Sequence, residues 1–207
     1  MAKEVILVGG FHEIIELCED CNYSIIGIID DMSKSNYWNY PIIGTDDNAT
    51  ELFNKYYSIP LVITPDRPQL RSRLTDYYRK IGYTFATLIS PDAKVSKSAI
   101  IEEGVVIQAG VNVSAACRIG AFSKLNTGCN IMHDVVIENF CTIAPNAVVL
   151  GRVKIAEFSY IGSNSTILSE IQIGKNVTIG AGAVVTKNIT NGLTAKGVPA
   201  RWFHVYK

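Results

Sequence analysis

Residues 112–137 read NVSAACRIGAFSKLNTGCNIMHDVVI, with a branched aliphatic side chain at every sixth position from the first valine. The spacing continues in both directions without an insertion. It covers sixteen positions: Val95, Ile101, Ile107, Val113, Ile119, Leu125, Ile131, Ile137, Ile143, Val149, Ile155, Ile161, Ile167, Ile173, Ile179 and Val185. Neither the period of a helix nor the two-residue period of an ordinary strand produces this pattern. A six-residue period is typical of a parallel β-helix, in which each hexapeptide forms one short side.

Three sides make a coil of about 18 residues, so residues 18 apart are expected to stack. Val113, Ile131 and Val149 form one such ladder. Four residues after each repeating aliphatic comes a small or aliphatic side chain, expected where the prism narrows: Ala99, Val105, Val111, Cys117, Ser123 and Cys129 are the first six. Because one repeat cannot bury its own apolar face, the repeats must stack and be capped.

The first 88 residues follow a different pattern, in which short apolar runs alternate with helical stretches. Strands are expected over residues 4–8, 24–29, 61–64 and 84–89, and helices over 11–21, from about 45 to 57 and from 65 to about 80. This alternation builds a small parallel α/β sheet. The sequence therefore predicts a Rossmann-like α/β domain over residues 1–90 and an all-β parallel β-helix with a C-terminal cap over residues 91–207, with Pro91 at the boundary.

Composition excludes several classes of protein. The 19 basic and 19 acidic residues balance, which argues against a nucleic-acid partner. No apolar run is long enough for a membrane span and no signal peptide is recognisable, so a cytoplasmic location is expected. The five cysteines are expected to be free thiols, and Cys18 and Cys21 lack the second pair that a zinc site would need. No metal is expected.

Gly9 and Gly10 follow the first expected strand and precede a helix. A glycine turn at a helix N-terminus is a ready site for phosphate, because backbone N–H groups and the helix dipole face the anion. Asp30 lies 21 residues after Gly9, where an acid would meet a ribose hydroxyl. The G-x-G-x-x-G string of NAD-binding domains is absent, which disfavours NAD.

The repeats contain aliphatic–glycine pairs, as at Ile119-Gly120 and Ile179-Gly180, and the chain closes with residues 180–187 (GAGAVVTK) and 197–201 (GVPAR). With the α/β half in front, nearly the whole chain resembles the sialic-acid O-acetyltransferase-like group of hexapeptide-repeat acyltransferases. That group includes bacterial N-acetyltransferases of nucleotide-linked 4-amino-4,6-dideoxy sugars, which contribute to cell-surface polysaccharides.

The resemblance implies a left-handed coil and a homotrimer. It also implies that acetyl-CoA lies in the groove between neighbouring prisms, where Gly180 and Ala181 would be among its contacts. The front domain would hold a nucleotide sugar and present it to that groove.

His133 is the one histidine within the repeats, at the third place of the hexapeptide 131–136, which should point outward. Residues 126–134 (NTGCNIMHD) resemble the family's active-site segment, in which the matching histidine is the general base. Imidazole suits that task because it titrates near working pH. Asp134 matches the family's acidic neighbour and would orient the ring, provided that the corner bends the chain there.

Gly151 lies 18 residues after His133, one coil further along. The resemblance implies that its N–H would bind the thioester carbonyl, although a corner glycine that needs a positive φ is an alternative interpretation. Thr142 stands nine residues after His133, where many relatives have a second histidine near the acetyl group.

The resemblance also suggests contacts with the nucleotide sugar. His12 corresponds to the histidine of the family's front turn, and Asp30 and Asp31 correspond to the paired acids that hold the nucleotide. Asn126 is a candidate for touching the sugar.

The expected function is acetyl-CoA-dependent N-acetylation of a nucleotide-linked amino sugar. O-acetylation of a sugar of the sialic-acid type stays open as the close alternative, and a non-catalytic nucleotide-sugar-binding scaffold as a more distant one. A carbonic anhydrase built on the same scaffold would need several histidines around a metal, and the repeats hold one.

Overall fold

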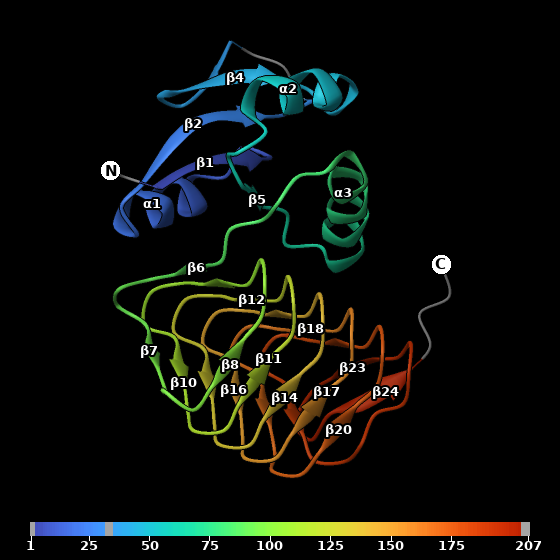
Figure 1. Cartoon of the computed structure of the whole chain (residues 1–207). Coiled ribbons are helices and arrows are strands. Elements are labelled where there is room, and N and C mark those ends of the chain that lie inside the picture. The colour runs from blue at the N-terminus through green and yellow to red at the C-terminus, as the bar shows by residue number, and fades with distance from the viewer. Residues whose placement is uncertain (1–2, 32–34, 204–207) are drawn as a thin grey trace. The chain divides into compact units, whose positions relative to one another are not determined.

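The computed structural model describes residues 3–31 and 35–203, and the chain divides into two compact units, residues 1–88 and 89–207 (Figure 1). Each unit is built on its own type of sheet. The first carries helices around a short open sheet, and the second is a three-sided coil of two-residue strands.

The first unit contains five strands in the order β3-β4-β2-β1-β5. Their bounds are β1 Lys3–Val8, β2 Tyr23–Ile29, β3 Asn36–Tyr37, β4 Tyr40–Gly44 and β5 Leu61–Ile63. The helices are α1 His12–Asp20, the 3₁₀ turn η1 Asp46–Asn48, α2 Ala49–Tyr56 and α3 Pro68–Ile81. All strand pairs are parallel except β3 with β4. The α/β class expected from the sequence is confirmed.

Local sequence explains these elements. The last four residues of β1 are buried, as a central parallel strand covered on both faces requires. Helix α1 buries one face, formed by Ile14, Ile15, Leu17 and Cys18. Helix α3 starts with Pro68, whose missing N–H is harmless in a first turn, and ends at Gly82 with φ +116.

The sheet of this unit differs from the expectation in two ways. Residues 84–89 do not form a fourth parallel strand of this sheet: Phe85 makes an isolated bridge to Leu61, and β6 Leu88–Ile89 joins the second unit's coil. The antiparallel hairpin of β3 and β4 was not predicted, because its two-residue turn contains Trp38 and Asn39 rather than a glycine pair.

The second unit is a left-handed parallel β-helix whose sides are three ladders of strands (Figure 1). The first side contains β7 Lys94–Val95, β10 Asn112–Val113, β13 Asn130–Ile131, β16 Val148–Val149, β19 Thr166–Ile167 and β22 Val184–Val185. The second side contains β8 Ile100–Ile101, β11 Arg118–Ile119, β14 Val136–Ile137, β17 Lys154–Ile155 and β20 Gln172–Ile173. The third side contains β6, β9 Val106–Ile107, β12 Lys124–Leu125, β15 Thr142–Ile143, β18 Tyr160–Ile161, β21 Thr178–Ile179, β23 Thr194–Lys196 and β24 Arg201–Phe203.

Each two-residue strand from β7 to β22 ends on one of the repeating aliphatics, which confirms the six-residue period. Val113 pairs with Ile131, and Ile131 with Val149, as the 18-residue stacking predicts. The repeating aliphatics fill one apolar core together with the small side chains, among them Cys117, Cys129 and Cys141. The chain therefore passes from the first side to the second and the third once in every coil.

The corners between the sides share one backbone conformation. Most corners place one residue in the left-handed region, and these residues are often not glycine, as at Phe140 (φ 58), Asn146 (φ 58) and Arg152 (φ 62). The coil ends where β24 pairs antiparallel with β23 and interrupts the parallel ladder.

Candidate active site

His133 lies in the corner between β13 on the first side and β14 on the second side. Its side chain is 51% exposed, so the ring points out of the prism as its place in the hexapeptide predicts. The buried aliphatics on both sides of this corner, Ile131 and Ile137, hold the backbone beneath it. The imidazole is therefore accessible, and the backbone that carries it is anchored in the apolar core.

Asp134 turns back onto this imidazole. Its φ of 59° is the bend that the chain needs for neighbouring side chains to meet, and Oδ2 lies 2.8 Å from Nδ1 of His133. An ionised carboxylate can only accept a hydrogen bond. Nδ1 of His133 therefore carries the proton and donates this hydrogen bond to Asp134. Nε2 is left with its lone pair, which is the arrangement that a general base needs.

Gly151 lies directly under the imidazole, one coil further along. A Cβ atom added to it would come within 2.7 Å of both Cε1 and Nε2 of His133. Gly151 itself has no positive φ; the left-handed residue of this corner is Arg152. The interpretation of Gly151 as a corner glycine that needs a positive φ is therefore wrong; a Cβ atom at this position would instead displace the imidazole.

The backbone N–H of Gly151 is also available as a hydrogen-bond donor. Within the described parts of the chain it donates to no acceptor, whereas its carbonyl accepts from the Glu170 amide. A backbone N–H beside the base is the kind of donor that stabilises an oxyanion.

The other residues expected at the acyl donor lie elsewhere on the prism. Thr142 begins β15 on the third side and is fully buried. Gly180 and Ala181 follow β21 and form the corner between the third and first sides. Within one chain the structure brings His133, Asp134 and Gly151 together, but not these three residues with them.

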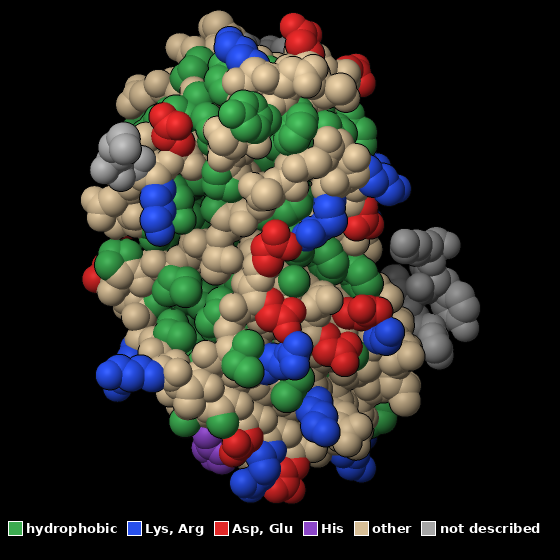
Figure 2. All heavy atoms as spheres, viewed as in Figure 1, with side chains coloured by type: hydrophobic (Ala, Val, Ile, Leu, Met, Phe, Trp, Pro, Cys, Tyr) green, Lys and Arg blue, Asp and Glu red, His purple; other side chains and the backbone are tan. Residues whose placement is uncertain are grey.

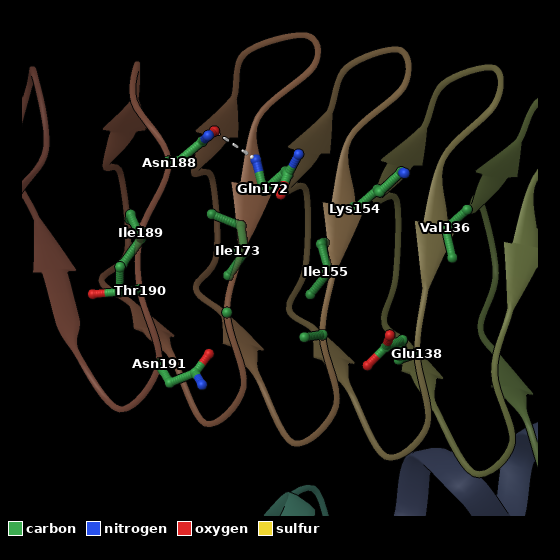
Figure 3. Close-up of a pocket in the computed structure, with 12 residues that line it drawn as sticks. Val136, Glu138, Lys154, Ile155, Gln172, Ile173, Asn188, Ile189, Thr190 and Asn191 are labelled. Atoms are coloured by element: carbon green, nitrogen blue, oxygen red, sulfur yellow. Dashed lines mark hydrogen bonds between the residues drawn. The ribbon is translucent and has the colours of Figure 1, made fainter.

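A groove of about 710 Å³ runs along the second side (Figure 3). Lys154, Gln172 and Asn188 lie along it, and the Gln172 amide donates to Oδ1 of Asn188 at 2.9 Å. Acidic and basic side chains are interspersed over this face (Figure 2). Sequence reasoning missed the groove, although its outward positions are the residues that precede each repeating aliphatic.

The second cluster of expected residues lies at the carboxyl edge of the first unit's sheet. Gly9 has φ +91, and the Gly10 amide donates to Oδ2 of Asp30 at 2.8 Å. These residues line a cavity of about 260 Å³ together with Phe11, Thr64, Pro65 and Asp66. The segment 64–66 is an addition to the expected set, and its signal was its place at the end of β5 on the same edge.

The remaining expected contacts are dispersed. Oδ1 of Asp31 accepts from the Asp46 amide at 3.0 Å, so the two neighbouring acids face different partners. His12 is exposed, with Nδ1 3.0 Å from the hydroxyl of Tyr37. Asn126 follows β12 and is 6% exposed, and its Oδ1 is buried with no hydrogen-bond partner among residues 3–31 and 35–203.

The five cysteines are free thiols. Burial raises the pKa of Cys129 to about 12, so this thiol stays neutral and unreactive at ordinary pH. No group of three or more His, Cys, Asp or Glu that could hold a metal occurs among the described residues. A helix long and apolar enough to cross a membrane is likewise not found in the described ranges.

Known proteins share the hexapeptide repeats of this chain. The family model for the bacterial transferase hexapeptide (six repeats) matches residues 116–151 and again 152–187. No curated protein matches the chain by sequence.

Solved structures match the chain over almost its whole length. A histidine-to-asparagine variant of perosamine N-acetyltransferase from Caulobacter crescentus, in complex with CoA and GDP-perosamine, is 27% identical with a TM-score of 0.93, over 98% of this chain and 97% of that one. The acetyltransferase domain of PglB from Neisseria gonorrhoeae, in complex with acetyl coenzyme A, is 29% identical with a TM-score of 0.90, over 97% and 99%. WeeI from Acinetobacter baumannii is 25% identical with a TM-score of 0.83, over 97% and 100%.

The repeats and the two-unit architecture thus agree with the matched structures along the full chain. The chain carries the repeats of the bacterial transferase hexapeptide model over residues 116–187 and is an acyltransferase.

Proposed function

We propose that this acyltransferase is an N-acetyltransferase that uses acetyl-CoA to acetylate the amino group of a nucleotide-linked 4-amino-4,6-dideoxy sugar, with His133 as general base. The observation that carries the proposal is the arrangement of Asp134, His133 and Gly151 at one corner. Two further facts support the substrate class. The matched structures include complexes with CoA, acetyl coenzyme A and GDP-perosamine, and a glycine turn at a helix N-terminus lies in the first unit.

Nε2 of His133 removes the proton from the sugar amine as its nitrogen attacks the thioester carbonyl carbon. The Gly151 amide donates to the carbonyl oxygen as negative charge develops there, an effect of roughly 3–4 kcal/mol for one such donor. Asp134 stabilises the imidazolium while it holds the proton. The C–S bond then breaks, His133 returns the proton to the departing thiolate, and the products are the amide and the free thiol.

The acyl donor would lie in a cleft shared by two subunits of a homotrimer. Gly180 and Ala181 belong to the corner between the third side and the first side, whereas His133 belongs to the opposite end of the first side. Thr142 is fully buried on the third side, so its side chain would not reach this cleft. One prism cannot place both sets on a single acetyl group. Two neighbouring prisms around a threefold axis can, because each presents a different corner to the shared cleft.

The first unit would hold the nucleotide. The Gly9 and Gly10 amides donate to Ile29 and Asp30, so the positive end of the helix α1 dipole, next to this turn, is what would favour a diphosphate; Asp30 follows β2, where a ribose hydroxyl is expected. The buried, unpartnered Oδ1 of Asn126 supports a polar contact with the substrate, because such an atom is rarely left unsatisfied.

The test measures acetyl transfer from acetyl-CoA to GDP-, UDP- and dTDP-linked 4-amino-4,6-dideoxy sugars. We expect turnover with at least one of them, and His133→Ala should lower kcat by roughly 10²–10⁴-fold. Lys97→Ala is the matched control, because Lys97 occupies the same place of the hexapeptide two coils earlier. Unchanged turnover in His133→Ala would falsify the general base, and transfer only to hydroxyl-bearing acceptors would assign O-acetylation instead.

A further inference from the structure

The turn between β3 and β4 presents a tryptophan in a conformation that rarely holds one. Trp38 is the first of two turn residues and has φ 51, a position that normally takes glycine or asparagine. A bulky residue in the left-handed region is an outlier. Its side chain is also 48% exposed, so burial does not compensate for the strain. The side chain is placed as if for a contact outside the folded chain.

Trp38 is part of a cluster of three rings, which we call the aromatic cluster: His12, Tyr37 and Trp38. The ring centroids of His12 lie 5.0 Å from those of Tyr37 and 5.6 Å from those of Trp38. The Tyr37 hydroxyl lies 3.0 Å from Nδ1 of His12, and this hydrogen bond fixes the positions of the two rings relative to each other. The cluster is therefore ordered although it is exposed.

The aromatic cluster lies on the glycine turn. A Cβ atom at Gly10 would lie 2.3 Å from Cδ2 of Tyr37, so this ring packs directly on the Gly10 backbone. The amide of the same glycine donates to Asp30. Tyr37, Asp30 and the glycine turn thus form one continuous surface.

The sheet order places this cluster and the segment 64–66, which lines the cavity of about 260 Å³, on opposite sides of the Gly9-Gly10 turn and Asp30. The β3–β4 hairpin lies at one edge of the sheet, and the segment 64–66 that lines the cavity follows β5 at the other edge. Asp30 follows β2, between these two. A ligand that places its phosphates at the Gly9-Gly10 turn and a ribose hydroxyl on Asp30 would direct its base toward the aromatic cluster.

We infer that the aromatic cluster stacks the nucleobase of the substrate, with Trp38 as the ring that the base covers. The inference rests on the proposed function, because it takes a nucleotide to be the ligand of this unit. Stacking suits any base, since every base has a flat π face, and it gives affinity without a strict choice of base.

Fluorescence can test the contact, because the chain has two tryptophans, Trp38 and Trp202. Trp202→Phe leaves Trp38 as the one indole fluorophore. In that background, titration with GDP or UDP should quench the emission saturably, whereas inorganic pyrophosphate, which lacks a base, should leave it unchanged.

Trp38→Gly separates a binding role from a structural one. Glycine suits a positive φ, so the melting temperature should be maintained or raised. The Kd for GDP or UDP, measured by calorimetry, should nevertheless increase roughly tenfold. Trp38→Phe keeps a ring and should restore most of the affinity.

The outcomes distinguish the two proposals. Equal affinity of Trp38→Gly and the unsubstituted chain for GDP and UDP, without quenching, would overturn the stacking role and leave the acetyltransferase proposal intact. Failure of the unsubstituted chain both to bind any nucleoside diphosphate and to acetylate any nucleotide sugar would overturn the two together.

Discussion

The imidazole of His133 lies over Gly151 of the next coil, so the backbone at Gly151 affects the orientation of the imidazole. The ring is held from two directions: Asp134 accepts from Nδ1, and the backbone of the next coil supports Cε1 and Nε2. A general base works only when its lone pair is aimed at the proton it removes. The orientation of His133 therefore depends on a glycine 18 residues away.

Gly151→Ala should damage catalysis more than stability. The added methyl group would push the imidazole aside, and a misplacement of about 1 Å can lower kcat about a hundredfold. The free energy of unfolding should change by less than about 0.5 kcal/mol, because Gly151 has no positive φ and its neighbour is an exposed side chain. Steady-state kinetics and thermal unfolding measure the two effects.

Gly192→Ala is the complementary control. Gly192 has φ +73 with no atom within 4 Å of an added Cβ, so alanine should lower the unfolding free energy by about 1 kcal/mol and leave kcat unchanged. If both variants lost stability and neither lost activity, the steric role of Gly151 would be refuted.

At the scale of the element, the corner between the second and third sides carries a ladder of aromatic rings. Phe140 stacks between Phe122 and Phe158, with centroids 5.3 and 5.4 Å away and rings nearly parallel, at 8° and 2°. At its N-terminal end the ladder stops at Gly104, where a Cβ atom would lie 2.4 Å from the Phe122 ring. All three phenylalanines occupy left-handed corner positions.

Phe140→Asn tests whether stacking outweighs the backbone strain. Asparagine tolerates the left-handed region better than phenylalanine and already occupies corner positions such as Asn146 and Asn164. The substitution forfeits two ring pairs of about 0.5–1.5 kcal/mol each. We expect a net loss of roughly 1–3 kcal/mol in the free energy of unfolding, measured by denaturant titration.

Ala116→Asn provides the comparison without a ladder. Ala116 is exposed and has φ 58, so asparagine there should leave stability unchanged or raise it slightly. A similar loss in both variants would show that asparagine itself, and not the missing rings, is unfavourable at these corners.

These elements also show how far the sequence alone could lead. The repeating aliphatics give the strands, the register and the interior, because a buried prism side accepts only such side chains. The corners were harder to read, since Phe140 and Arg152 carry no sign of a left-handed backbone. The bend at Asp134 is of this kind, so the sequence could name the acid beside His133 but could not show that it reaches the ring. The same reasoning applies to Trp38, whose turn lacks a glycine.

At the scale of the whole molecule, the first and second sides of the prism differ in their outward residues. Those of the first side from β10 onward are Asn112, Asn130, Val148, Thr166 and Val184, none of which is charged. The second side carries Arg118 and Lys154 at the same places. An uncharged side is suited to burial against other copies of the chain, because charges are depleted from the centre of interfaces. This difference supports a trimer around the first side.

A shared active site can be tested by mixing two inactive variants. His133→Ala removes the base, and Ala181→Arg would block the acyl donor from the other side of the cleft while leaving the fold intact, since Ala181 is exposed. Each homotrimer should be inactive. In trimers reassembled from equal amounts of both, a site that takes His133 from one subunit and Ala181 from the next is intact in about a quarter of cases. The mixture should therefore recover about a quarter of the unsubstituted activity, whereas a site formed within one chain would recover none, because every chain in the mixture carries a defect.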